Sequence, residues 1–406
     1  MTFTRVQEPR ALRARDVGDA RHGRTSHARP TSRRLPCETS RVKRTVGVEE
    51  EFLLVGDDGQ PVARAAEALE ASGTDDKGGG TGSLESEFME EQLETATHPR
   101  RELDDLATEI RDGRRRAQEA ADTVGARVAA LSTSPLPFEG TTVSRLRYLE
   151  ARAAFGLTAR EQLTSGCHVH VAVADDVEGV AVLDRIGPWL STLLALSTNS
   201  PFWQGEDSGY ASFRSQVWSR WPTAGPTRAF GTPEAYREAV DGLVATGTIL
   251  DENMVYFDAR LSSRYPTVEI RVADVCLDPD TATLVAALSR GLVETAAREA
   301  AQGTPPPELR PEILRTAAWR AGRSGLEDDL VSPLTWRPAP AHDVVGQLVA
   351  HVRDALVDAG DLDAVTELLG RVWSGGNGAA RQRAWFAASG GDLRAVVEKS
   401  VEVTHS

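Results

Sequence analysis

The sequence contains few cysteines and no long hydrophobic run. Its three cysteines, Cys37, Cys167 and Cys276, are too few and too far apart for a disulfide framework or a CxxC metal site. No apolar run approaches the roughly 20 residues that a membrane-spanning helix needs. Neither membrane insertion nor a secreted disulfide scaffold is therefore expected, and a reducing cytoplasm is the predicted compartment.

Motifs of several enzyme classes are also missing. The glycine-rich stretch at 77–82 is not followed by Lys-Ser or Lys-Thr, so it is not a P-loop, and a flexible connection between strands is the simpler interpretation. There is no H-E-x-x-H motif, which disfavours zinc catalysis. The pattern of residues does not suggest a Ser-His-Asp or Cys-His nucleophile either.

Composition indicates a soluble globular protein. The 406 residues are 40% hydrophobic and 26% charged, enough for one large domain or two ordinary ones. The net charge is −14, although residues 1–44 hold 12 Lys and Arg against four acidic residues. An acidic body disfavours nucleic acid as a partner. We expect a disordered basic extension at 1–44 and a catalytic domain at 45–406 whose part from about 308 onward is helical.

Hydrophobic periodicity predicts irregularly alternating strands and helices, which is typical of an α+β domain with an antiparallel sheet. The expected strands are 45–55, 83–97, 164–174, 254–261 and 267–275. The expected helices are 101–131, 180–196 with Pro188 interrupting or kinking it, 233–250 and 279–301. The segment 199–226 is predicted to be a long functional loop.

Two of these strands place acidic residues on one face. Alternate residues of a strand point to opposite sides, so Glu49 and Glu51 share the face opposite Val48 and Phe52. Likewise Glu90, Gln92 and Glu94 share a face in 83–97. Adjacent carboxylates repel each other unless a cation lies between them. A solvent-exposed sheet face explains the same pattern.

Two further strands carry basic and acidic groups in the same way. His168 and His170 project from the face opposite Cys167, where we expect the thiol to be inert. Glu269 and Arg271 share a face in 267–275. Paired histidines suit a metal or phosphate, and the arginine fork matches phosphate oxygens. Core histidines bonded to the backbone and a structural ion pair remain alternatives.

Taken together, the four strands concentrate glutamate, histidine and arginine on the face that avoids the core. Oxygen-rich ligation without cysteine is what Mg²⁺ or Mn²⁺ prefers, and Mg²⁺ accompanies nucleotide phosphates. The segment 214–226 adds Arg214, Arg220, two tryptophans and several hydroxyls. Such a segment can bind a substrate carboxylate or a phosphate, or it can be a surface loop held by its tryptophans.

These blocks resemble the glutamate–cysteine ligase family. Gly47-Val48-Glu49-Glu50-Glu51 is similar to its G-[IV]-E-x-E signature, and Gly166-Cys167-His168 and Val268-Glu269-Ile270-Arg271 follow in the family's order, after a block from Glu90 through Glu94 to Thr97. The likeness spans about 44–300 and is strongest to the type 2 carboxylate–amine ligases. It implies a curved, glutamine synthetase-like antiparallel sheet with helices on its convex face and ATP on its concave face.

The resemblance also implies roles for single residues. Mg²⁺, or Mn²⁺, would be held by Glu49, Glu51, Glu94, His168 and Glu269. Arg271, Arg214 and Arg220 would act on phosphate and on the substrate carboxylate, and His170 and Glu90 would help to bind the nucleotide. The implied reaction is ATP-dependent amide formation between glutamate and an amine such as cysteine, through an acyl phosphate.

Two other functions fit the same residues. A metal-dependent hydrolase would use this face to activate water and would turn over without ATP. A non-catalytic nucleotide-binding homologue would bind ATP without releasing ADP. The sequence leaves open the identity of the amine and whether the protein forms a homo-oligomer.

Overall fold

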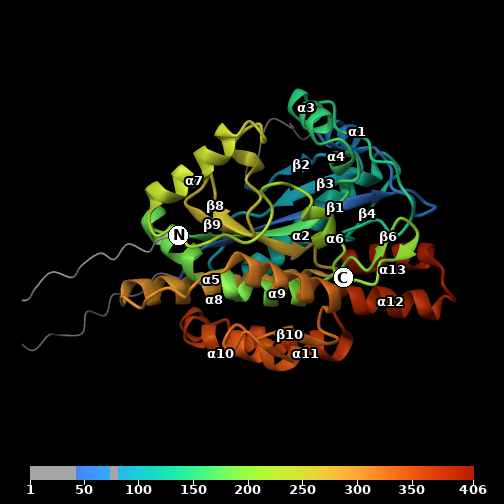
Figure 1. Ribbon diagram of the computed structural model, residues 1–406. Coiled ribbons are helices and arrows are strands. Elements are labelled where there is room, and N and C mark those ends of the chain that lie inside the picture. The colour runs from blue at the N-terminus through green and yellow to red at the C-terminus, as the bar shows by residue number, and fades with distance from the viewer. Residues whose placement is uncertain (1–42, 74–80) are drawn as a thin grey trace, which may run out of the picture. The chain divides into compact units, whose positions relative to one another are not determined.

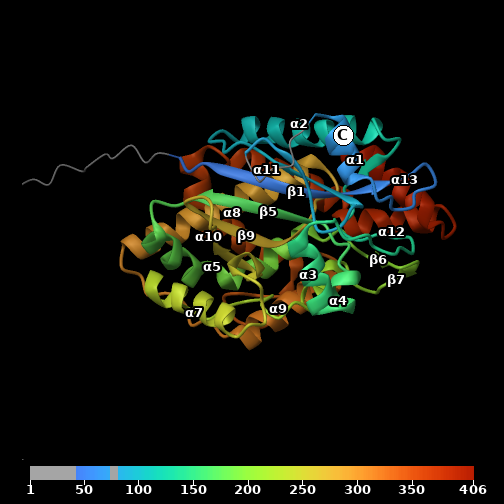
Figure 2. The ribbon, with the colours of Figure 1, turned by 90° about the horizontal axis from the view of Figure 1, so that it is seen from above.

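The computed structural model describes residues 43–73 and 81–406. The expected basic extension, apart from its last two residues, and most of the glycine-rich stretch lie outside these ranges. Within them one antiparallel sheet organises the chain (Figures 1 and 2). Its strand order is β2 (Leu84–Ser86), β3 (Gln92–Ala96), β1 (Val46–Val55), β5 (Gly166–Ala172), β9 (Thr267–Asp274) and β8 (Ala259–Leu261), with β4 (Arg127–Ala129) paired to β1.

Helices connect and cover these strands. Those before β9 are α1 (Ala65–Ala71), α2 (Leu103–Asp122), α3 (Leu146–Phe155), α4 (Leu157–Arg160), α5 (Asp176–Ser197), α6 (Arg214–Trp218), α7 (Pro233–Ala245) and the 3₁₀ helix Glu252–Met254. Those after it are α8 (Pro279–Ala301), α9 (Pro311–Ser324), α10 (Ala341–Ala359), α11 (Leu362–Gly375), α12 (Gly378–Ala388) and α13 (Leu393–Thr404). Two small hairpins complete the fold, β6 (Phe202–Trp203) with β7 (Glu206–Asp207) and β10 (Asp329–Val331) with β11 (Pro338–Pro340).

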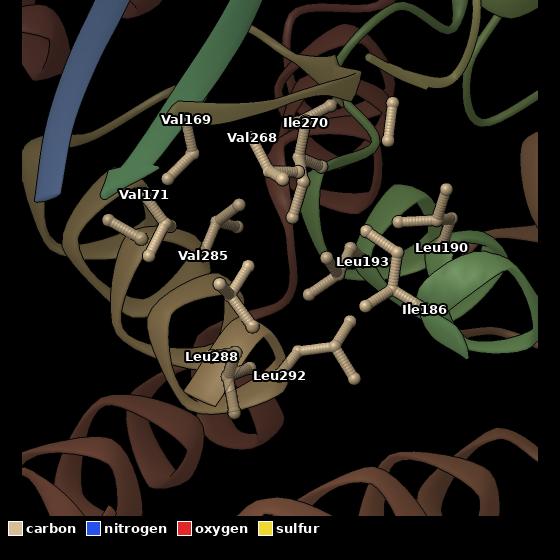
Figure 3. Close-up of a cluster of buried hydrophobic side chains, with 14 of the residues drawn as sticks. Val169, Val171, Ile186, Leu190, Leu193, Val268, Ile270, Val285, Leu288 and Leu292 are labelled. Carbon is tan, nitrogen blue, oxygen red and sulfur yellow. The ribbon is translucent and has the colours of Figure 1, made fainter. Parts of the chain in front are cut away.

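The main core lies between one face of the sheet and the two longest helices. Side chains of β5 and β9 point toward α5 and α8, and the cluster is shown in Figure 3. It includes Val169, Val171, Val268 and Ile270 from the strands, Ile186, Leu190 and Leu193 from α5, and Val285, Leu288 and Leu292 from α8. This packing fixes which way each strand faces, because a one-residue slip would turn the valines away from the helices.

Helix α5 belongs to this core. By length and composition alone its residues Asp176–Ser197 could cross a membrane, but 78% of the apolar stretch is buried inside the protein. Its start is fixed by Asp175, whose side chain accepts a hydrogen bond from the Glu178 N–H. Pro188 lies inside the helix and does not interrupt it, contrary to one of the two expectations for this residue.

A buried ion pair joins β1 to α2 on the helix side of the sheet. Arg114 is fully buried, and its Nε and Nη2 donate to the two carboxylate oxygens of Glu50 at 3.0 and 2.5 Å. The same guanidinium donates to the carbonyls of Cys276, Leu277 and Thr404. Glu50 therefore serves the core, whereas its neighbours Glu49 and Glu51 point to the opposite face.

Several element boundaries differ from expectation. The stretch 83–97 is two strands, because the chain turns between Glu87 and Glu91 before β3 begins. The expected helix 101–131 ends at Asp122, since Gly125 takes a positive φ of 66° and the chain then enters β4. The segment after 308 is mainly helical, with the β10–β11 hairpin within it.

The chain is held in place from the start of the described residues. Arg44 donates to Glu294 at 2.6 Å and to Glu178 at 2.8 Å, and Lys43 lies 3.4 Å from Asp361. These two residues, which the sequence assigned to the extension, pack against the folded domain.

Candidate active site

Strand register brings the predicted polar residues together. Residues directly opposite each other on paired strands share a face and lie side by side. On the face away from the core, the opposed pairs across the sheet are Glu85–Glu94, Glu94–Glu51, Glu49–His168, His170–Glu269 and Glu269–Arg260. The alternation seen separately in each strand therefore becomes one continuous row of ionisable side chains.

This row forms the floor of a cavity of about 600 Å³, within the usual range for small-molecule sites. Small residues such as Gly47, Ala96 and Ala172 also line the floor, so a ligand can approach the backbone closely there. The predicted residues that line the cavity are Glu49, Glu51, Glu94, His168, His170, Glu269 and Arg271.

Three of these residues are arranged to hold a cation. Ligand atoms of Glu49, His168 and Glu269 lie within 4.8 Å of one another. His168 Nδ1 is 3.5 Å from Glu49 Oε2, and its Nε2 is 3.8 Å from Glu51 Oε1. Within the described residues, Nε2 of His168 is buried without a hydrogen-bond partner, whereas Nε2 of His170 is buried 3.3 Å from Glu49 Oε1. Buried polar atoms of this kind need a partner, and a bound ion supplies one.

The carboxylates at the β1–β3 end of the row repel one another when they are ionised together. Burial, followed by the charge of Glu87, raises the pKa of Glu51 to about 7. Burial and the charges of Glu87 and Glu49 also raise the pKa of Glu94 well above its usual value. One Glu51 oxygen accepts the Gly166 N–H at 2.6 Å. A divalent cation would relieve this repulsion, so the donor set fits Mg²⁺ or Mn²⁺.

The histidine and arginine end is electrostatically different. Burial lowers the pKa of His168 to about 4, helped by the charge of Arg271, which leaves a neutral imidazole able to bind a metal. Burial alone would raise the pKa of Glu269, but the positive charges of Arg271 and Arg260 outweigh this effect and lower the pKa of the carboxyl below its usual value. Arg260 Nε donates to Glu269 at 2.7 Å, and Arg271 donates to the same carboxylate.

The structure does not bring every predicted residue to the cavity. Glu90 lies on the turn before β3, where its carboxylate accepts the Ala66 N–H at the start of α1. Arg220 pairs with Glu161 at the protein surface. Neither Glu90 nor Arg220 lines the cavity, because β3 begins only at Gln92 and α6 ends at Trp218 before Arg220.

Arg214 is placed differently from Arg220. It is 2% exposed, lies 3.9 Å from Asp274, and its charge acts on Glu51. Burial lowers the pKa of Arg214 despite the nearby charges of Asp274 and Glu51. Its guanidinium also lies 5.6 Å from the centre of the Trp218 ring, which borders the cavity. Arg214 therefore supports the cavity wall and contributes positive charge beside the carboxylates.

Sequence reasoning missed several residues of the site. Glu87 follows β2 and lines the cavity beside Glu94, and Arg260 comes from the three-residue strand β8. Trp218 and Tyr256 lie against Arg271, with ring centres 5.8 and 6.0 Å from its guanidinium. A signal existed only for Trp218, which belongs to the aromatic segment after Arg214.

Comparison with known proteins shows the family to which the chain belongs. A model of the family described as "Glutamate-cysteine ligase family 2 (GCS2)" matches residues 45–399. A protein from Streptomyces avermitilis, described as a candidate glutamate–cysteine ligase 2-1, is 52% identical over 89% of this chain and 99% of its own length. A similarly described protein from Streptomyces coelicolor is 51% identical over 89% and 99%.

Solved structures share the fold at low sequence identity. A bifunctional glutathione synthetase from Pasteurella multocida superposes with a TM-score of 0.64 and 16% identity, covering 89% of this chain and 52% of that one. A glutamate–cysteine ligase from Francisella tularensis, solved in complex with AMP, also gives a TM-score of 0.64, with 14% identity over 90% and 89% of the two chains. These two likenesses confirm the expected fold class.

Proposed function

Because the chain belongs to glutamate–cysteine ligase family 2, we propose that it uses ATP to join the γ-carboxylate of glutamate to an amine. The product is a γ-glutamyl amide, and Mg²⁺ is the accompanying metal, with Mn²⁺ as its substitute. The substrates are small molecules, and the reducing cytoplasm is the compartment in which we expect the enzyme to work.

One observation carries this proposal. The cross-strand row places carboxylates, neutral imidazole and arginine on the floor of a single cavity, in an order set by the register of the strands. Phosphoryl transfer requires positioning and charge neutralisation rather than a protein nucleophile. The row supplies both. Among the described residues, Cys167 and Cys276 are buried in the hydrophobic core rather than in the cavity, and the Cys276 thiol contacts the Asp274 carbonyl.

In the first step, a γ-carboxylate oxygen of glutamate bonds to the γ-phosphorus of ATP. The bond from that phosphorus to the β–γ bridging oxygen breaks, and ADP leaves. Arg271 lines the cavity, where its guanidinium can bind the transferring phosphoryl group, and Arg260 is a second cation that stays paired with Glu269. Glu49, Glu51, Glu94, His168 and Glu269 would hold the metal, which neutralises phosphate charge when bound.

In the second step, the amine nitrogen bonds to the acyl carbon, and the bond from this carbon to the phosphate oxygen breaks. Phosphate leaves and the nitrogen loses a proton, which gives the amide. The Glu87 carboxylate, which lines the cavity beside Glu94, can bind the protonated amine and accept the proton that the nitrogen must lose before it attacks.

The proposal is tested by phosphate release with ATP, Mg²⁺ and glutamate across a panel of amines. We expect release that requires glutamate and one class of amine together, and loss of at least about 100-fold in Glu49→Gln. Glu119→Gln, on the exposed face of α2, is the matched control and should keep full activity. Release without glutamate, or full activity in Glu49→Gln, would show that the site works differently.

A further inference from the structure

One end of the cavity is lined by aromatic rings. Phe88 lies 5.2 Å from Tyr148 and 6.4 Å from Trp221, and Tyr256 lies 5.6 Å from Trp221 and 4.9 Å from Trp218, measured between ring centres. All five residues line the cavity. We refer to these five residues, Phe88, Tyr148, Trp218, Trp221 and Tyr256, as the aromatic wall.

The aromatic wall continues into other apolar side chains, and a hydrogen bond holds one of its rings. Trp221 Nε1 donates to Gln162 Oε1 at 2.7 Å, which fixes the orientation of the indole. Ala151, on α3, and Met254 also line this end and are 5% and 2% exposed. A surface prepared in this way can bind an apolar group without reorganising.

The aromatic wall reaches the reacting groups. The guanidinium of Arg271 lies 5.8 and 6.0 Å from the ring centres of Trp218 and Tyr256. Glu87, which is next to Phe88 in the chain, belongs to the acidic cluster with Glu51 and Glu94. A substrate lying against the rings would therefore have one end at the phosphoryl-binding arginine and the carboxylates.

The chemistry of the three substrates separates them along the cavity. The triphosphate of ATP and the carboxylates of glutamate are charged, and the row of ionisable side chains matches those charges. The adenine of ATP is aromatic, but a ribose and two phosphates separate it from the γ-phosphate, whereas the aromatic wall begins 5.8 Å from Arg271, the arginine assigned to the transferring phosphoryl group. The rings and Met254 offer mainly apolar surface, which rewards the burial of carbon rather than of charge. Of the three substrates, the amine acceptor is the one that can carry an apolar substituent next to its reacting nitrogen.

We propose that the aromatic wall selects an amine acceptor that carries an aromatic or branched apolar substituent larger than the side chain of cysteine. This inference rests on the proposed ligase function and names the substrate class of its second step. The amine nitrogen lies toward Glu87, and its substituent lies against Phe88, Tyr148 and Trp221. Cysteine, with one polarisable CH₂–SH group, leaves most of this surface without a partner.

The test compares kcat/KM for four acceptors at saturating ATP, Mg²⁺ and glutamate, with the amide product identified by mass spectrometry. The acceptors are 2-phenylethylamine, isoamylamine, methylamine and cysteine. We expect the two larger apolar amines to exceed methylamine and cysteine by at least about tenfold, since each methylene in an apolar pocket is worth about 10-fold or more.

Two variants assign the preference to the aromatic wall. Ala151→Leu fills the space before the rings and should lower kcat/KM for phenylethylamine at least about tenfold, with methylamine changed less than about threefold. Ala153→Leu, on the exposed side of the same helix, is the control and should match the wild type. Tyr148→Leu removes one ring and should reduce the phenylethylamine preference if Ala151→Leu fails to fold by its thermal unfolding curve.

The outcomes separate this inference from the proposed function. Equal or faster turnover of cysteine or methylamine by the wild type overturns the inference while the ligase stands. An unchanged preference in both folded wall variants overturns it as well. No phosphate release with any amine overturns the ligase assignment and the inference with it.

Discussion

Two adjacent glutamates on β1 should have opposite roles, and replacing each in turn tests how the strand is used. Glu50 points to the helix side, where its carboxylate is 2% exposed and bonded to the fully buried Arg114. Glu49 points into the cavity, opposite His168. Glu50→Gln should therefore lower stability, and Glu49→Gln should lower activity.

The magnitude for Glu50→Gln follows from what the change leaves behind. Arg114 would keep its bonds to three backbone carbonyls but lose the only carboxylate that contacts it among the described residues. Breaking a buried ion pair by neutralising one partner costs about 3–5 kcal/mol, because the remaining charge stays buried. The substituted amide keeps the shape of the side chain and one acceptor oxygen, so the expected loss lies at the lower end, about 3 kcal/mol.

The assay is urea unfolding followed by circular dichroism, with the midpoint and slope compared between variants. The double variant Glu50→Gln/Arg114→Met removes both charges and should recover a large part of the loss. Glu49→Gln should unfold close to the wild type while losing turnover. Wild-type stability in Glu50→Gln, or lower stability in Glu49→Gln than in Glu50→Gln, would contradict these opposite roles.

The same geometry yields three further predictions. Burial raises the pKa of Asp258 to about 7, above the value of about 4 in the unfolded chain. Part of the stability present below pH 4 is therefore lost as the pH rises from about 4 to 7. Asp258→Asn should reduce this loss by about 2–4 kcal/mol, measured as the difference between the unfolding free energies at pH 4 and pH 7. Mg²⁺ should raise the wild-type thermal midpoint as its concentration rises, whereas metal-free Glu94→Gln should gain stability because one like charge is gone and should respond less to Mg²⁺; a wild-type midpoint independent of Mg²⁺ would contradict the metal site. Arg214→Ala and Arg271→Ala should each lower kcat/KM about 100-fold or more, while Arg220→Ala, a surface residue, should stay within about twofold; equal losses in all three would refute the placement.

The strands made most of the floor predictable. Alternation with period two assigned Glu49, Glu51, His168 and Glu269 to the face away from the core, and packing against α5 and α8 keeps them there. No sequence pattern gives the register that places Glu49 opposite His168, because strand pairing joins residues far apart in the chain.

The rest depends on where elements end and on nonlocal pairing. Glu90 looked equivalent to Glu94 only while 83–97 was a single strand, and the turn before Gln92 directs it to α1 instead. Glu87 and Arg260 come from short segments whose periodicity is too brief to assign a face. Their roles follow from the side-chain contact of Glu87 with Glu94 and from the strand pairing of Arg260 with Glu269.

The ligase mechanism can be tested by following oxygen atoms from glutamate to phosphate. Glutamate carrying ¹⁸O in both γ-carboxylate oxygens is incubated with ATP, Mg²⁺ and an accepted amine, and the released phosphate is analysed by mass spectrometry. Activation through an acyl phosphate predicts one ¹⁸O atom in each phosphate formed. Phosphate that takes its fourth oxygen from water instead would contradict the ligase mechanism and indicate hydrolysis of ATP at this site.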